Sequence, residues 1–327
     1  MKILVTGGAG YIGSHVVKEL IEAEHEVVIL DNMSTGVKMN INPKAEFVFG
    51  DILSTNDLKR VLKPGIDAVF HFAAFKAAGE SMLRPEIYAH NNLTGTINLL
   101  NAMLANGVKK FVFSSSAAVY GNPEYLPVDE SHPLQPENFY GFTKLEIERL
   151  LQWYGQLKGL RFAALRYFNA AGYDIDGRIR GKEINPANLL PVVMEVASGQ
   201  RPKLLVYGSD YDTIDGTGVR DYIHVNDLAT AHLLALDYLI NNPDNLRINL
   251  ATGAGYSVMQ VIEKAREITG QSIEYDLVDR RPGDPSELYA TSLIAAEKLY
   301  WKPRYSDLNT ILKSMWEIYT NDISDQI

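Results

Sequence analysis

Tyr140 and Lys144 have the spacing of an acid–base pair. They lie four positions apart in a stretch whose pattern predicts a helix, so the phenol and the ammonium would share one helix face. A free tyrosine has a pKa of about 10, too high for a general base at neutral pH. A neighbouring ammonium or a cationic nicotinamide stabilises the phenolate and lowers that pKa. Tyr154 and Lys158 repeat the spacing at a helix end, next to Gly155 and Gly159, where a surface position is the simpler interpretation.

Three consecutive serines, Ser114, Ser115 and Ser116, occur where a predicted strand over residues 110–114 ends. The carboxyl edge of such a strand is where α/β sheets bind ligands. A hydroxyl at this edge can share a hydrogen bond with the substrate oxygen that the phenol contacts. The alternative is a polar strand end without a function. For Ser116 the position favours a site shared with Tyr140.

A glycine-rich loop joins the first predicted strand to the first predicted helix, with the sequence Gly7-Gly8-Ala9-Gly10-Tyr11-Ile12-Gly13. Its glycines let backbone N–H groups approach a pyrophosphate at the helix N-terminus. Asp31 ends the second predicted strand, where a carboxylate accepts hydrogen bonds from the ribose of NAD and repels the 2′-phosphate of NADP. Asp51 and Ile52, after the third strand, are placed to border the adenine. The pattern predicts an NAD site; the alternative is a tight turn without a ligand.

The elements that must position these residues alternate in type through the first half of the chain. Strands are predicted over residues 2–6, 26–31, 46–49, 68–72, 110–114 and 161–167, and helices over 12–23, 56–62, 85–106 and 140–154. This alternation is typical of a parallel sheet covered by helices. The predicted fold is therefore α/β, a Rossmann-type doubly wound parallel sheet.

The regular alternation ends near residue 172. Residues 173–183 and 208–219 are expected to be irregular. Helices are predicted over 189–199, 224–241 and 258–270, and strands over 204–207 and 247–250. We expect residues 1–170 to form the NAD-binding domain and residues 171–327 a smaller α/β substrate domain, with parts of 220–250 packed against the first.

Composition narrows the class of protein further. The chain has 327 residues, a net charge of −9 and no cysteine. An acidic balance argues against nucleic-acid or membrane partners, and the absence of cysteine excludes disulfides and thiolate chemistry. No apolar stretch is long enough for a membrane helix, and the histidines show no metal-binding spacing, so we expect no metal. The expected location is the cytoplasm.

Several segments together resemble the UDP-glucose 4-epimerases of the extended short-chain dehydrogenase/reductase family. The matching segments are residues 7–15, 72–81, 113–121, 165–172 and 216–227. One departure is Phe139, where relatives usually carry proline. Ala117 and Ala118 stand where dehydratase relatives carry an acidic pair, which disfavours elimination.

The resemblance implies catalytic roles for three residues: Tyr140 as the base, Ser116 as its partner, and Lys144 as the residue that binds the nicotinamide ribose and tunes Tyr140. It also implies NAD contacts, with Lys76 near the cofactor phosphate and nicotinamide and Asn91 beside the cofactor. The full set of expected cofactor contacts is Gly7, Gly10, Tyr11, Ile12, Gly13, Asp31, Asn32, Asp51, Ile52, Phe72, Ala73, Ala74, Lys76, Asn91, Ser114, Tyr140, Lys144 and Tyr167.

The resemblance further implies a site for a UDP-sugar. Two arginines on separate segments, Arg220 and Arg281, can clamp a pyrophosphate with paired hydrogen bonds, although either alone is more simply a surface ion pair. Leu288 occupies a position where a bulky aromatic residue restricts some relatives, so N-acetylated sugars could fit. The expected substrate contacts are Lys76, Ser116, Tyr140, Phe168, Asn169, Asn188, Leu189, Leu205, Tyr207, Arg220, Tyr222, Arg281, Asp284 and Leu288.

The implied reaction interconverts UDP-galactose and UDP-glucose. The sugar is oxidised transiently at C4 by bound NAD, the 4-keto intermediate rotates, and the hydride returns to the opposite face. The NAD is expected to stay bound, and a homodimer built on the helices over 85–106 and 140–154 is expected. Alternatives are a related epimerase for UDP-N-acetylhexosamines, UDP-glucuronate or UDP-pentoses such as UDP-xylose, and, more remotely, a non-catalytic NAD-binding regulator.

Overall fold

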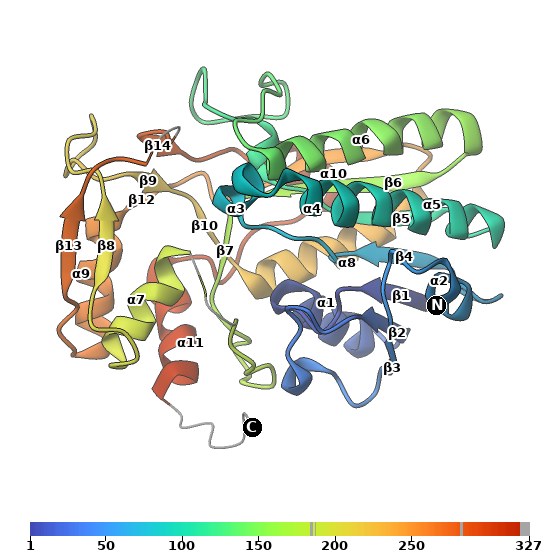
Figure 1. Ribbon diagram of the computed structural model, residues 1–327, viewed down its shortest axis with the longest axis horizontal. Helices are drawn as coiled ribbons and strands as arrows, with labels where there is room; N and C mark the ends of the chain where they lie inside the picture. The colour runs from blue at the N-terminus through green and yellow to red at the C-terminus, as the bar shows by residue number, and fades with distance from the viewer. Residues whose placement is uncertain (184–185, 187, 282–283, 321–327) are drawn as a thin grey trace.

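The structure is a computed structural model that describes residues 1–183, 186, 188–281 and 284–320. Its centre is a seven-stranded parallel sheet in the order β11-β6-β5-β4-β1-β2-β3 (Figure 1). The sheet strands are β1 (Lys2–Thr6), β2 (Glu26–Asp31), β3 (Glu46–Phe49), β4 (Ala68–His71), β5 (Lys110–Ser114), β6 (Arg161–Tyr167) and β11 (Leu246–Leu250). The predicted doubly wound sheet is confirmed.

Helices cover both faces of this sheet. One face carries α1 (Tyr11–Glu22), α8 (Val225–Asn241) and α10 (Leu293–Leu299), and the other carries α2 (Thr55–Val61), α5 (Gly95–Ala105) and α6 (Phe139–Lys158). Successive strand residues serve opposite faces: Ile3 and Val5 pack toward α1, whereas Leu4 packs toward α5 and α6. The strands are therefore apolar throughout, as expected for a sheet buried on both sides.

Two elements of this layer differ from the sequence prediction. The single helix expected over 85–106 is α4 (Pro85–Tyr88), a π-helical turn η2 (Ala89–Thr94) and α5. A short helix α3 (Ala78–Leu83) precedes them and was not predicted. A search for apolar residues at a period of 3.6 does not reveal the π-helical turn, because that turn is defined by its i to i+5 hydrogen bonds.

A smaller group of elements lies at one end of the sheet (Figure 1). Helices α7 (Leu189–Ala197), α9 (Val258–Thr269) and α11 (Leu308–Thr320) share one apolar core with β8 (Leu204–Tyr207). The remaining short elements of the described chain are η1 (Lys38–Asn40), η3 (Ala117–Val119), β7 (Asn169–Ala171), β9 (Val219–Arg220), β10 (Tyr222–His224), β12 (Tyr256–Ser257), β13 (Tyr275–Val278) and β14 (Glu287–Leu288).

Two elements from the second half of the chain, β11 and α8, belong to the seven-stranded sheet and its helix cover. Strand β11 pairs in parallel with β6, from Leu246 opposite Ala163 to Leu250 opposite Tyr167. Helix α8 packs against α1 and contributes Leu228, Leu236 and other residues to the same core. The large sheet is thus completed by residues far from its other strands in sequence.

Candidate active site

Ser116 and Tyr140 are brought together by two helix starts. Asn138 caps α6 by accepting a hydrogen bond from the backbone N–H of Gly141 at 2.8 Å. Ser116 caps η3, its hydroxyl accepting from the N–H of Ala118 at 3.1 Å. The two starts touch so closely that a Cβ on Gly141 would lie 2.3 Å from the carbonyl oxygen of Ala118. The Ser116 hydroxyl lies near enough to the Tyr140 phenol to lower the pKa of that phenol.

Tyr140 differs from the sequence expectation in its pKa. Among the chain's own groups, burial raises the pKa of Tyr140, and the hydrogen bond with Ser116 opposes that rise only in part. Lys144 lies near the phenol, with Nζ 5.7 Å from the centre of the Tyr140 ring and 2.7 Å from the carbonyl oxygen of Ser114. Burial lowers the pKa of Lys144 to about 7, so its charge is only partly retained at neutral pH.

The second tyrosine–lysine pair is separate from this site. Tyr154 lies in the last turns of α6, and its hydroxyl donates to the side-chain oxygen of Asn101 at 2.9 Å. Lys158 is the exposed last residue of that helix. The pair therefore has the surface position that its flanking glycines indicate.

The glycine loop leaves a cradle at the start of α1. A Cβ on Gly7 would lie 2.7 Å from the N–H nitrogen of Ala73, and one on Gly13 would lie 2.2 Å from the carbonyl oxygen of Gly7. Gly7 also has a φ of +75°, a conformation that glycine adopts without strain. Gly10 is the N-cap of α1, and its helix N-terminus attracts an anion. These residues fit the pyrophosphate of a dinucleotide.

The ends of β2 and β3 border the same cradle. The Asp31 carboxylate accepts from the N–H groups of Ala9 at 3.0 Å and Met33 at 2.8 Å. Burial raises the pKa of Asp31, against these two hydrogen bonds. Asn32 donates to Asp51 at 2.9 Å, which joins the two loops. Ile52 is buried against Gly95, so only its backbone could face a ligand.

The other predicted cofactor residues lie along the carboxyl edge of the sheet. Phe72, Ala73 and Ala74 follow β4, and Gly7 packs directly on the first two. Ile12 is in the first turn of α1, and Asn91 lies in η2, where its amide donates to Asn92 at 3.0 Å. Ser114 and Tyr167, at the ends of β5 and β6, share a hydrogen bond.

Residues 172–183 approach the cradle, which the sequence pattern did not indicate. The Tyr11 hydroxyl donates to the carbonyl of Gly172, and Lys76 forms an ion pair with Glu183. Gly181 exchanges two hydrogen bonds with the side chain of Asn40, at 2.8 and 3.2 Å. No local signal marks Glu183 or Asn40, because both act through contacts more than 100 positions away.

A second cluster gathers predicted substrate residues. Arg220 pairs with Asp284 at 2.5 Å, and Leu288 lies opposite Arg220 in the parallel pairing of β14 with β9. The Asn169 amide donates to the carbonyl of Asp221 at 2.9 Å. Phe168 and Tyr222 are buried, which limits what their side chains could offer a ligand.

The outer part of this cluster is more open. The guanidinium carbon of Arg281 lies 3.8 Å from the centre of the Tyr207 ring. Leu205, two residues earlier on β8, is 45% exposed. Asn188 lies at the N-cap position of α7 without a side-chain capping hydrogen bond, and Leu189 is the first residue of that helix. An exposed arginine stacked on an aromatic ring is a surface suited to a planar anionic ligand.

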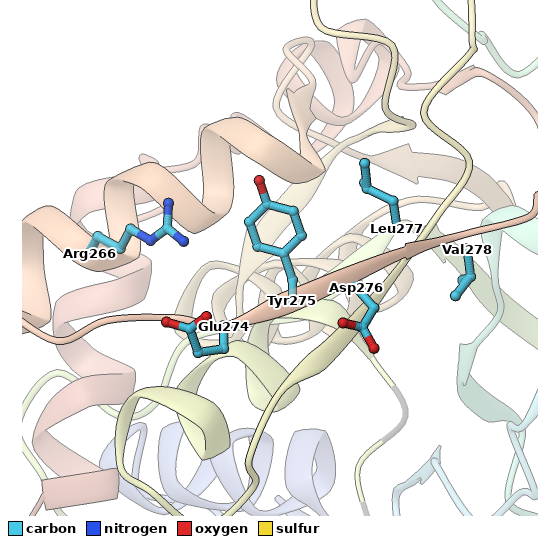
Figure 2. Close-up of a pocket in the computed structure, with 6 residues that line it drawn as sticks. All are labelled: Arg266, Glu274, Tyr275, Asp276, Leu277 and Val278. Carbon is cyan, nitrogen blue, oxygen red and sulfur yellow. The ribbon is translucent and has the colours of Figure 1, made fainter.

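Two hollows lie away from these clusters. One, of about 660 Å³, is lined by Arg266 of α9 and residues 274–278 (Figure 2). Figure 2 shows Tyr275 and Leu277 on the helix side of the strand and Asp276 on the other. The other hollow, of about 680 Å³, lies beside α6 and includes Glu148 and Arg166. Among the described residues, neither is lined by a predicted site residue.

The seven-stranded parallel sheet and the glycine cradle at its carboxyl edge together define a dinucleotide-binding α/β protein, with Ser116, Tyr140 and Lys144 grouped at the same edge. The chain belongs to the NAD dependent epimerase/dehydratase family, whose model matches residues 3–251. Among the described residues, no helix is long and apolar enough to cross a membrane.

Relatives and solved structures match over nearly the whole chain. UDP-glucose 4-epimerase of Streptococcus mutans is 46% identical over 97% of this chain and 96% of its own length. The structure of UDP-glucose 4-epimerase from Brucella ovis in complex with NAD is 44% identical, covers 97% of this chain and 98% of that chain, and has a TM-score of 0.94. The Bifidobacterium longum enzyme in complex with NAD⁺ and UDP is 38% identical, covers 98% and 99%, and has a TM-score of 0.93.

Proposed function

We propose that this protein is a UDP-glucose 4-epimerase that interconverts UDP-galactose and UDP-glucose with bound NAD. The observation that carries the proposal is the position of the Ser116–Tyr140–Lys144 group on the sheet edge that also holds the glycine cradle. Near-full-length identity of 43–46% to curated UDP-glucose 4-epimerases supports it. The glycine cradle and Asp31 would hold NAD, which would supply a reversible hydride acceptor for C4 of the sugar.

We propose that Tyr140 and Ser116 carry out the proton transfer at the C4 hydroxyl. The Tyr140 oxygen takes the proton of the C4 hydroxyl and later returns it, while the Ser116 hydroxyl holds that oxygen by a hydrogen bond. Because burial alone raises the pKa of Tyr140, the phenolate needs a nearby positive charge. Lys144 supplies it from the same helix face, which ties the activity to the protonated state of Lys144.

The two units divide the binding between them. Residues 1–170 hold the dinucleotide, and residues 171–327 hold the UDP-sugar, with α8 and β11 serving the first unit. Arg220 and Arg281 lie on separate segments and would hold the diphosphate from two sides. The Arg220–Asp284 ion pair keeps that guanidinium in place before a substrate arrives.

The direct test incubates the purified protein with UDP-galactose, with no NAD added, and follows UDP-glucose formation. Turnover is expected, because the cradle predicts NAD that stays bound through purification. If no product forms with or without added NAD, and the bound nucleotide is confirmed, the proposed reaction is wrong. Turnover only of UDP-glucuronate or UDP-xylose would favour a related epimerase, and NAD binding without any turnover would favour a regulator.

A wider sugar range follows from the place of Leu288 beside Arg220. A leucine leaves more room than an aromatic ring, so we expect UDP-GalNAc to be turned over alongside UDP-galactose. The structure of a Campylobacter jejuni enzyme named UDP-Glc/GlcNAc 4-epimerase, 40% identical, supports this range. Leu288→Tyr should lower UDP-GalNAc turnover at least tenfold while UDP-galactose turnover changes little. Negligible UDP-GalNAc turnover by the unaltered protein would contradict the expectation.

We further propose a homodimer in the cytoplasm. The expected interface includes the helix over 140–154, and there α6 exposes the apolar side chain of Trp153, which is 60% exposed. Burying such side chains between two copies is favourable. Sedimentation equilibrium should give twice the chain mass, and Trp153→Glu should shift the protein toward the monomer. A monomer at all concentrations would contradict the proposal.

A further inference from the structure

A buried ion pair lies directly behind the acid–base site. Glu148 on α6 and Arg166 on β6 are both 2% exposed, with Nη2 of Arg166 2.6 Å from Oε2 of Glu148 and Nε 3.0 Å from Oε1. Such a pair costs a large desolvation free energy and is often no more stabilising than apolar residues of the same size. Its presence therefore calls for a reason beyond stability.

The first connection of the pair is to the serine segment. The hydroxyl of Ser115 donates to Oε1 of Glu148 at 2.6 Å. Ser115 directly precedes Ser116, whose hydroxyl caps η3 and contacts the phenol of Tyr140. The carboxylate thus fixes the backbone from which Ser116 projects.

The second connection is to the outer strand of the sheet. Nη1 of Arg166 donates to the hydroxyl of Tyr120 at 3.0 Å, and that hydroxyl donates to Asn249 on β11 at 2.6 Å. All three nitrogens of the Arg166 guanidinium thus donate hydrogen bonds: Nε and Nη2 to Glu148, and Nη1 to Tyr120. This network holds the Glu148 side chain in one position relative to β6 and β11.

The third connection is to Lys144, which lies one helical turn before Glu148. Residues four apart on a helix are neighbours, and the Glu148 charge raises the pKa of Lys144 against the effect of burial. The titratable groups that face Lys144 are Tyr140 on the same helix and His71 on β4. Tyr167 on β6 is linked to it through Ser114, whose hydroxyl shares a hydrogen bond with Tyr167 and whose carbonyl accepts from Lys144. Burial lowers the pKa of His71 to about 3, so it is neutral there.

We propose that Glu148, held by Arg166, is a positioning residue for the epimerisation: its carboxylate holds the Ser115–Ser116 segment and keeps the positive charge on Lys144. This inference rests on the proposed function. Glu148 touches neither the phenol nor the substrate cluster, so it acts through Ser115 and Lys144. Removing its charge leaves Lys144 neutral over more of the pH range, and a neutral Lys144 no longer stabilises the phenolate.

The test compares pH profiles of kcat for the unaltered holoenzyme and Glu148→Gln. Losing the carboxylate lowers the pKa of Lys144, so the alkaline limb should move to lower pH by about one unit. A shift of that size is a tenfold loss of kcat on the alkaline side. KM for UDP-galactose should change less than twofold, and the bound NAD should be retained. Glu146→Gln, which removes a partly exposed carboxylate on the same helix, is the matched control and should leave the limb in place.

Two further variants separate positioning from folding. Glu148→Met combined with Arg166→Met removes both charges and is expected to fold, since apolar replacement of a whole buried pair is often tolerated. The alkaline limb should move in the same direction but by less, because the cation of Arg166 is removed together with the carboxylate of Glu148. Ser115→Ala keeps the ion pair and should lower kcat with no shift of the limb. An unshifted limb in both charge-removing variants would overturn the inference, whereas inactivity of the unaltered protein would overturn the proposed function instead.

Discussion

Tyr140→Phe is expected to abolish epimerisation while the protein keeps its NAD. The substitution removes one oxygen from a half-buried ring and leaves the start of α6 intact, because Asn138 and Ser81 hold the backbone of that turn. Without the phenol, the Ser116 hydroxyl is a far weaker acid and a poor replacement, and Lys144 is held 2.7 Å from the carbonyl oxygen of Ser114. The loss of an acid–base group is worth about 10²–10⁴-fold in rate.

Tyr154→Phe is the matched control for this experiment. It removes the same oxygen from the same helix, and from a tyrosine that also has a lysine four residues later. Rates of UDP-glucose formation from UDP-galactose, measured with equal bound NAD, should fall only for Tyr140→Phe. Full activity of Tyr140→Phe would overturn the assignment of the base, and a comparable loss in both variants would point to a structural effect.

Gly13→Ala is expected to produce a protein that holds little or no NAD. The new Cβ would lie 2.2 Å from the carbonyl oxygen of Gly7, a contact between two backbone segments that no side-chain rotation relieves. The glycine loop must therefore open, which moves the N–H groups at the start of α1 away from a pyrophosphate. We expect bound NAD to fall at least tenfold and activity without added NAD to fall with it.

The measurement is the NAD released on denaturation, per mole of purified protein. Gly79→Ala is the control, because a Cβ at that glycine of α3 meets nothing within 4 Å. The control should keep its full nucleotide content. Stoichiometric NAD in Gly13→Ala would show that the loop tolerates the methyl group. The proposal that the close contact at Gly13 is required for NAD binding would then be wrong.

Much of the architecture was predictable from contiguous sequence. The runs over residues 2–6, 26–31 and 161–167 have the composition and length of buried strands, and the structure places strands at the same bounds. The glycine loop, Asp31 and the Tyr140–Lys144 spacing were likewise visible, because each depends on a local turn or on helix geometry. From the sequence, parts of residues 220–250 are expected to pack against the first domain. That expectation does not include the pairing of residues 246–250 with β6 in the same sheet, since the pairing depends on which chain segment lies beside β6.

The residue types and their spacing by themselves determined the strand–loop–helix order, the glycine cradle and which side chains could perform chemistry. Only the tertiary structure decided the state of those side chains. Burial between β5 and α6 sets the pKa of Lys144, and the approach of β6 gives Glu148 its partner Arg166. The physical reason is that periodicity is a property of neighbours along the chain. Desolvation and charge pairing depend instead on how close distant segments come when the layers pack.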